Sequence, residues 1–478
     1  MKKTVSLLFL IFSLQCTNAQ NKKPDEIFYV KPYLQVGHFP SVGSLELLWQ
    51  GSDTIANWIV EYRSTSKDSW KKAELGAAKR LAVKNIAPRR LYSASFKGLS
   101  PGTTFMYRVL KEKKVVFEAE AKSLKSPDQS YRFIAFGDIG AGTAEQKAIV
   151  NRVYESKPDL IMVPGDIVYE HGTALEYDTR FWPIYNADKV DGFGVPLIRS
   201  VPFVVSTGNH DTDMRDLDQF PDGLAYYYFW DLPLNGPVTK EGGPLAPNLK
   251  ATEENRKAFI DAAAEAYPGM TNYSIDYGNA HWTFLDSNPY VDCTSKDLSE
   301  WLAKDLAAAK DATWRFVIFH HPGFNSSREH YEQQQMRLLS PVMEAGKVDV
   351  VFNGHVHNYQ RTFPLKFTPD KQGTLLVGGK DSKTIRGRVV NGKWVLDKTF
   401  DGKTDTTPEG IVYIITGAGG QALYNPEQNN DPDSWQRFTD KFVSNVHSFT
   451  VVDVEGKTLQ IKQVTAEGKE IDGLKITK

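Results

Sequence analysis

Cysteine is scarce in this chain of 478 residues, which contains only Cys16 and Cys293. Internal disulfides therefore contribute little, and packed cores must hold the fold. An excess of charge of one sign is also missing, because 57 basic residues face 58 acidic ones and the formal net charge is −1. No strong field draws the protein to nucleic acid, which we do not expect as a partner. Beyond the N-terminus, no apolar run reaches the roughly 18 residues that a transmembrane helix requires.

Length and composition favour a multidomain globular protein. The chain exceeds the about 150 residues of an ordinary domain, so we expect two or three cores. Hydrophobic residues at 41% and aromatic residues at 12% supply enough apolar surface for those cores. Wholesale disorder is therefore excluded.

The N-terminus has the features of a leader. Two lysines precede an apolar stretch at 5–14 that is too short to span a bilayer. Small residues, Thr17 and Ala19, stand where a signal peptidase expects them for a cut before residue 20. We therefore predict a signal peptide over 1–19 and an exported protein, periplasmic or secreted. The alternative is a lipoprotein anchored through Cys16, although the usual leucine three positions before the cysteine is absent.

Residues 26–127 predict an all-β domain. Short alternating segments at 44–50, 56–63, 91–97 and 105–111 follow one another without a long helical period. This pattern is typical of a β-sandwich. The run GLSPGTTFMYRV, from residue 98, resembles the corner and following strand of a fibronectin type III domain. A polar segment at 123–130 suits a linker.

Residues 128–478 predict an α/β domain. Apolar strands alternate with helical stretches, of which 144–156 and 298–309 have the clearest helical pattern. Two long interruptions, 214–270 and 366–409, are rich in glycine, proline and aromatic residues, and we expect surface loops and hairpins there. The aromatic cluster at 226–230 favours a packed loop core over a substrate mouth.

Residue types that bind metals stand at the ends of most of these apolar strands. In open α/β sheets the strand ends meet at one edge, so side chains far apart in sequence converge there. One such residue alone would indicate a capping or turn residue, but several in order, most of them after a glycine, predict a metal site. The candidates are Asp138 in GDIG, Asp166 and Tyr169 in GDIVY, Asn209 and His210 in GNHD, His320 in VIFH, and His355 and His357 in GHVH.

This series resembles the metallophosphoesterases, specifically the purple acid phosphatases, over most of residues 30–450. The resemblance implies two mixed sheets flanked by helices, an αββα sandwich, behind the N-terminal β-sandwich. It also implies two metal ions bridged by Asp166. The first ion would be held by Asp138, Tyr169 and His357, and the second by Asn209, His320 and His355.

The charge of the ligands limits which metal ions can occupy the two sites. A phenol with a pKa of about 10 ionises near neutral pH only on a strongly Lewis-acidic ion, which favours Fe(III) at the Tyr169 site. The neighbouring site, with nitrogen and oxygen ligands, suits Fe(II), Zn(II) or Mn(II). Two such ions can clamp a phosphoryl group and activate water, so we expect direct attack by a metal-bound hydroxide on a small phosphate monoester.

Departure of the alcohol also requires an acid, and His210 and His330 are the candidates. For His330 the resemblance supplies the argument, because it lies ten residues after His320, in a run where plant members of the family carry an active-site histidine. A packed or surface histidine is the alternative for each. His321 directly follows a predicted ligand, and we expect it to point elsewhere. Cys293 is expected to be buried and inert, and the glycine-rich stretch 417–420 to form a turn.

Other functions fit the same motifs. A phosphodiesterase, or a nucleotide or pyrophosphate hydrolase, could use the same metal core, because the metals do not select the leaving group. A non-catalytic binding or adhesion protein is suggested by the fibronectin-like segment, but such a protein would be expected to have lost ligands, and none is missing. The sequence leaves the oligomeric state open.

Overall fold

The computed structural model describes residues 26–370, 377–378 and 387–478. The predicted signal peptide at 1–19 and the alternative anchor Cys16 lie outside these residues. Within them, no helix has both the length and the apolar composition needed to cross a membrane.

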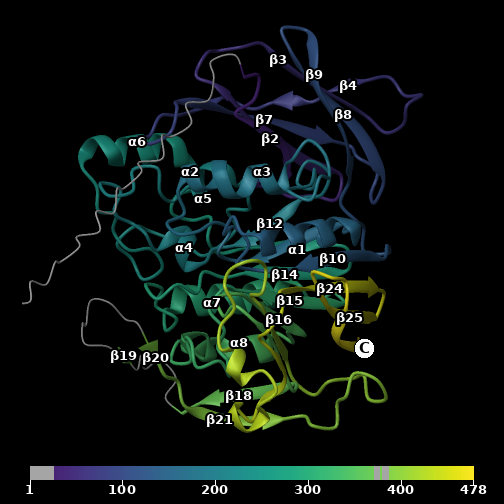
Figure 1. Cartoon of the computed structure of the whole chain (residues 1–478), viewed down its shortest axis with the longest axis vertical. Helices are drawn as coiled ribbons and strands as arrows, with labels where there is room; N and C mark the ends of the chain where they lie inside the picture. The colour runs from purple at the N-terminus through teal and green to yellow at the C-terminus, as the bar shows by residue number, and fades with distance from the viewer. Residues whose placement is uncertain (1–25, 371–376, 379–386) are drawn as a thin grey trace, which may run out of the picture.

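The N-terminal region is built from two antiparallel sheets, as predicted for a β-sandwich. Along β2, the buried side chains of Leu45, Leu47 and Trp49 alternate with more exposed neighbours, so that one face of the strand enters the core. This region lies at one end of the long axis, at the top of Figure 1. The five-stranded sheet contains β1 (Val30–Gln35), β2 (Ser44–Ser52), β7 (Arg89–Lys97), β5 (Glu74–Leu75) and β6 (Lys79–Leu81), and the four-stranded sheet contains β4 (Lys71–Lys72), β3 (Trp58–Arg63), β8 (Thr104–Lys111) and β9 (Lys114–Lys122).

Two mixed sheets form the rest of the molecule. The six-stranded sheet has the order β12 (Phe203–Ser206), β11 (Leu160–Pro164), β10 (Tyr131–Ala135), β24 (Ser448–Glu455), β25 (Thr458–Thr465) and β26 (Glu470–Thr477). The seven-stranded sheet has the order β13 (Tyr273–Tyr277), β14 (Ala280–Phe284), β15 (Trp314–Ile318), β16 (Val350–Asn353), β22 (Val412–Thr416), β17 (Tyr359–Thr362) and β23 (Thr439–Val443). Strands β10 to β12 are parallel, as are β14, β15, β16 and β22.

Aromatic side chains join the two sheets face to face. The ring of Phe133 on β10 lies 4.7 Å from that of Trp282 on β14 and 5.5 Å from that of Phe316 on β15. The next residue on β15, Val317, belongs to a separate apolar cluster that includes Leu302 of helix α7 (Lys296–Ala308). Because successive side chains on a strand alternate between faces, one sheet supplies both the central core and the surface on which α7 and α8 (Ser340–Ala345) pack.

The predicted helices are present, and one interruption is more ordered than predicted. Helix α1 (Ala144–Glu155) begins at Thr143, whose side chain accepts from the Gln146 N–H. The prediction of loops and hairpins over 214–270 is wrong in part, because this segment contains α5 (Tyr226–Phe229) and α6 (Glu253–Ala263). The aromatic residues of 226–230 are buried, as expected for a packed core. The interruption 366–409 contains a hairpin strand, β21 (Gly392–Leu396), paired with β18 (Leu365–Pro369), and part of it lies outside the described residues.

The sandwich and the two-sheet region share a buried interface. Arg89 donates to both carboxylate oxygens of Asp178, at 3.0 and 2.7 Å, and the Arg89 side chain is buried. Tyr107 Oη donates to the Arg199 carbonyl at 2.8 Å. The predicted boundary between residues 127 and 128 falls between β9 and β10.

Candidate metal centre

The predicted ligands gather where parallel strands of the two sheets end. Asp138, Asp166 and Asn209 follow β10, β11 and β12, and His320 and His355 follow β15 and β16. Three of these strand-end residues turn sharply, with left-handed φ of 62° at Asp138, 51° at Asp166 and 68° at His355. Such conformations are costly and cluster at functional sites.

Asp138, Tyr169 and His357 form one group of buried side chains. Tyr169 Oη donates to Asp138 Oδ1 at 2.9 Å and lies 3.2 Å from His357 Nε2. His357 Nδ1 lies 2.8 Å from the Ala422 carbonyl, which can only accept. The Nδ1 therefore carries the proton, and Nε2 presents its lone pair to the group.

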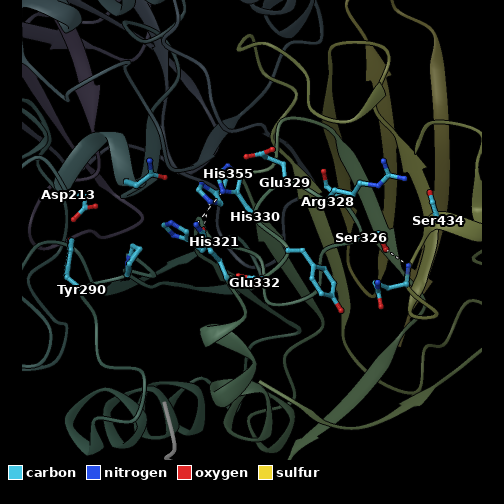
Figure 2. Close-up of a pocket in the computed structure, with 16 residues that line it drawn as sticks. Asp213, Tyr290, His321, Ser326, Arg328, Glu329, His330, Glu332, His355 and Ser434 are labelled. Atoms are coloured by element: carbon cyan, nitrogen blue, oxygen red, sulfur yellow. Dashed lines mark hydrogen bonds between the residues drawn. The ribbon is translucent and has the colours of Figure 1, made fainter. Parts of the chain in front are cut away.

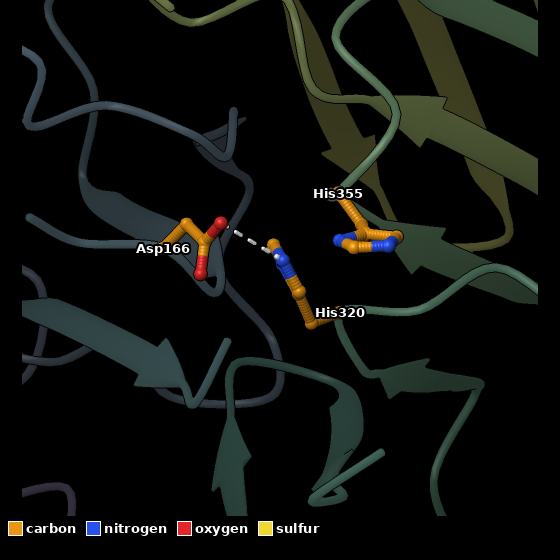
Figure 3. Close-up of side chains that lie close together, drawn as sticks. All are labelled: Asp166, His320 and His355. Carbon is orange, nitrogen blue, oxygen red and sulfur yellow. Dashed lines mark ion pairs between the residues drawn. The ribbon is translucent and has the colours of Figure 1, made fainter. Parts of the chain in front are cut away.

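Asp166, Asn209, His320 and His355 form the second group. The ligand atoms of Asp166, His320 and His355 all lie within 4.8 Å of one another, as Figure 3 shows. His320 Nδ1 lies 2.8 Å from the Pro164 carbonyl, so its Nε2, 3.2 Å from Asp166 Oδ2, is the nitrogen that faces the centre. Asn209 Oδ1 is buried and has no hydrogen-bond partner among the described residues.

His355 presents its other nitrogen to the centre. Its Nε2 lies 2.6 Å from Gln333 Oε1, an acceptor, and therefore carries the proton. The lone pair of Nδ1 is left, and Figure 3 shows one ring nitrogen of His355 directed toward His320.

The centre contains two carboxylates that, among the described residues, no arginine or lysine neutralises. Asp138 and Asp166 are fully buried, and both carboxylates form ion pairs with histidines. Burial opposes charge on His320, yet the neighbouring Asp166 carboxylate raises the pKa of that imidazole to about 9. Burial together with the charges of Asp138 and Asp166 raises the pKa of the Tyr169 phenol. Buried carboxylates without a strong base beside them call for bound cations.

The backbone leaves room for these side chains only because glycine stands beside them. A Cβ at Gly354 would lie 2.8 Å from Asp138 Oδ2 and 2.9 Å from His320 Nδ1, and one at Gly165 would lie 2.6 Å from the same nitrogen.

The potential metal ligands of the two groups are carboxylate, phenol, amide and imidazole, which suit iron, zinc or manganese. The residues present therefore fit two metal ions.

An open pocket of about 1180 Å³ adjoins the second group (Figure 2). His330 lines it with its ring 4.0 Å from that of His355, and burial lowers the pKa of His330 to about 4. The His210 ring lies 4.4 Å from the Tyr169 ring. Burial lowers the pKa of His210, but the carboxylates of Asp166 and Glu170 outweigh this and raise it. Both candidate acids are therefore at the centre.

The expectation that His321 points elsewhere is wrong. This side chain is 1% exposed, lines the pocket, and has its ring 4.1 Å from that of His355. The reason is that β15 ends at Ile318, so the alternation of a strand no longer sets the direction of residues 320 and 321.

Two further residues at the centre were not predicted. Asp211 accepts from the N–H groups of Ile167 and Gly208, at 3.0 and 2.8 Å, and so ties together the loops that carry Asp166 and Asn209. Its position in GNHD was the available signal. Tyr424 stacks on His357 with ring centroids 4.1 Å apart, and no feature of the sequence near it indicated this.

Cys293 is buried, as expected, and 417–420 forms a loop that follows β22. A Cβ at Gly417 would lie 2.8 Å from Asp138 Oδ2, so this loop packs on the centre.

Comparison with known proteins agrees with this geometry. The family model of the calcineurin-like phosphoesterases matches residues 131–359. This region is a calcineurin-like phosphoesterase domain. It contains every predicted metal ligand and both candidate acids, whereas the antiparallel sandwich precedes it.

Homologues of the phosphoesterase domain include plant purple acid phosphatases. The chain is 27% identical over 248 residues to purple acid phosphatase 22 of Arabidopsis thaliana, a match that covers 50% of this chain and 47% of that protein. It is 30% identical over 248 residues to the phosphoenolpyruvate phosphatase of Allium cepa, covering 50% and 43%. The chain thus spans about half the length of these curated relatives.

A solved structure shares the fold. The purple acid phosphatase isolated from yellow lupin (Lupinus luteus) seeds superposes with a TM-score of 0.63 and 17% sequence identity, over 94% of this chain and 74% of that one. The predicted fold, two mixed sheets with an antiparallel domain before them, is confirmed.

Proposed function

We propose that this protein is an exported phosphatase that hydrolyses phosphate monoesters at a binuclear metal centre. The observation that carries the proposal is the convergence of the predicted ligands from both sheets at the edge of an open pocket. The names of the relatives point to the same chemistry, because those proteins are phosphatases.

We assign Asp138, Tyr169 and His357 to the first ion, the remaining three ligands to the second, and Asp166 to a position between the two. Bound ions would supply positive charge to the phosphoryl oxygens and lower the pKa of a water molecule. Fe(III) at the Tyr169 site, with Fe(II), Zn(II) or Mn(II) at the other, is the metal content that the ligands favour.

The chain's own groups orient these ligands and provide the acid. The Pro164 and Ala422 carbonyls fix the tautomers of His320 and His357. His210 is the first candidate to protonate the leaving oxygen, because nearby carboxylates keep its ring charged to higher pH. His330 is the second candidate, and its low pKa makes it a neutral ring at pH 7.

The charges that line the pocket favour monoesters over pyrophosphates and nucleotides. Three carboxylates, Asp213, Glu329 and Glu332, line it together with one guanidinium, that of Arg328. A leaving group that itself carries phosphate would be repelled by this excess of negative charge.

Export and domain boundaries belong to the same proposal. We propose removal of residues 1–19 as a signal peptide, a fibronectin-like sandwich over 26–127 and a catalytic region over 128–478. The sandwich contains none of the ligand motifs, so we assign it no chemistry.

Replacing the residue between the two ions tests the proposal. Asp166→Asn should lower turnover of p-nitrophenyl phosphate by at least about 100-fold at limiting metal, because a ligand of a two-metal site loses its charge. Asp349→Asn is the matched control, since Asp349 precedes β16, at the opposite end of the strand that leads into His355. Near-normal turnover in Asp166→Asn, with the control also active, would mean that the proposed site is wrong.

A further inference from the structure

His321 is a buried side chain of the pocket that the proposed mechanism does not use. It lies on the loop after β15. The centroid of its ring is 5.1 Å from that of His320 and 4.1 Å from that of His355. Figure 2 shows His321 beside His330 and His355, among the residues that line the pocket.

Ser287 determines which nitrogen of His321 carries the proton. The backbone N–H of His321 donates to Ser287 Oγ at 2.9 Å, and the same Oγ lies 3.1 Å from His321 Nδ1. No other acceptor for this hydroxyl is found among the described residues. The arrangement that satisfies both groups therefore has Ser287 donating to Nδ1, which leaves the ring proton on Nε2.

The Nε2–H then remains as an unused donor at the pocket. Within the described part of the chain it has no hydrogen-bond acceptor, and His321 itself lines the pocket. A nitrogen that carries a proton cannot be a metal ligand. What it can bind is an oxygen of a molecule that enters the pocket next to His320 and His355.

We propose that His321 Nε2–H donates a hydrogen bond to a phosphoryl oxygen of the substrate, so that His321 is a substrate-binding residue of this site. The inference rests on the proposed phosphatase function, because the adjacent His320 and His355 are the assigned ligands of the second ion.

Calorimetry of inorganic phosphate binding to the metal-loaded full-length protein tests this without relying on turnover. His321→Ala should weaken phosphate binding by about 10-fold or more, the loss expected for a hydrogen bond to a charged group. His321→Gln keeps an N–H near the position of Nε2 and should stay within about 3-fold of the wild type. The matched control is His281→Gln, which alters a buried histidine near the start of β14, and should leave phosphate binding unchanged.

Metal content, measured on the same samples, separates the alternatives. Unchanged phosphate affinity in His321→Ala overturns the inference, and so does loss of a metal ion from it, which would make His321 a ligand. If His321→Ala does not fold, Ser287→Ala replaces it as the test. This substitution allows the ring proton of His321 to occupy either nitrogen, so phosphate binding should weaken a few-fold. Unchanged phosphate binding in Ser287→Ala would overturn the inference. Phosphate binding that depends on His321 in a protein without phosphatase turnover would contradict the proposed function and leave this inference standing.

Discussion

Each histidine assigned to a metal has one ring nitrogen fixed by an acceptor of the protein. The acceptor is the Pro164 carbonyl for His320, the Ala422 carbonyl for His357 and the Gln333 side chain for His355. Outer hydrogen bonds of this kind orient the ring and set the tautomer before a metal arrives. The centre is therefore preorganised through residues that the ligand motifs do not contain.

Replacing Tyr169 tests whether the first ion is Fe(III). The purified protein should absorb broadly in the visible, because a tyrosinate on Fe(III) transfers charge to the metal. Tyr169→Phe should remove this absorption and keep the fold, since only the phenol oxygen, which contacts Asp138 and His357, is lost. A colourless wild type with full zinc occupancy and good activity would show that iron is the wrong assignment.

Replacing His330 tests whether its ring donates the proton to the leaving oxygen. If this ring helps protonate the leaving oxygen, His330→Ala should slow alkyl phosphates by about 10-fold or more relative to p-nitrophenyl phosphate, whose leaving group needs little proton assistance. Rates on both esters, with metal content, provide the measurement. Equal losses would indicate a phosphate-binding role, which the low pKa of His330 would also suit, and no loss would leave it a packed histidine.

At the scale of elements, the strands were predictable, whereas the conformations of the loops that follow them were not. Alternation of apolar residues placed β2, β3, β7 and β8 within two residues of their observed bounds. The left-handed turns at Asp138 and His355 depend on contacts between loops, which no local pattern records. The ligand set could be anticipated because each of its residues lies within five residues of the end of a strand, whereas Tyr424 reaches His357 from a distant loop.

Helix α6 escaped prediction for a similar reason. Its segment is rich in charge, and its buried side chains, among them Phe259 and Ala262, acquire an apolar surface only through the sandwich and α5. Tertiary packing of this kind outweighs local propensity.

A buried histidine on β14 makes the seven-stranded sheet sensitive to alkaline pH. His281 lies between Asp276 and Asp305, at 2.8 and 3.0 Å. Burial lowers its pKa, but hydrogen bonds to both carboxylates outweigh this and raise it to about 9. The folded state therefore holds the proton more tightly than the unfolded chain, whose histidine pKa is about 6.5.

The stability that this charge provides is fully present below pH 6.5 and is lost as the pH rises to about 9. The free energy of unfolding of the wild type, measured by urea, should exceed that of His281→Gln by up to about 3 kcal/mol at pH 6. The difference should shrink toward pH 9.5. A difference that stays constant with pH would show that His281 acts through packing alone.

At the scale of the whole molecule, the sandwich is part of the scaffold rather than an appended module. Its core belongs to the same apolar cluster as the central aromatic residues of the two sheets. The Arg89–Asp178 ion pair crosses the interface, and Tyr33 Oη donates to the Phe229 carbonyl at 2.8 Å. The sequence predicted two domains, but it could not predict this shared core, because the contacting segments are far apart in the chain.

The central claim is that two metal ions per chain are required for phosphate ester hydrolysis. We would add metal back to the metal-depleted full-length protein and measure p-nitrophenyl phosphate turnover and bound metal on the same samples. Turnover should rise with metal and reach its plateau at two ions per chain. A plateau at one ion, or turnover in the protein without metal, would contradict the account.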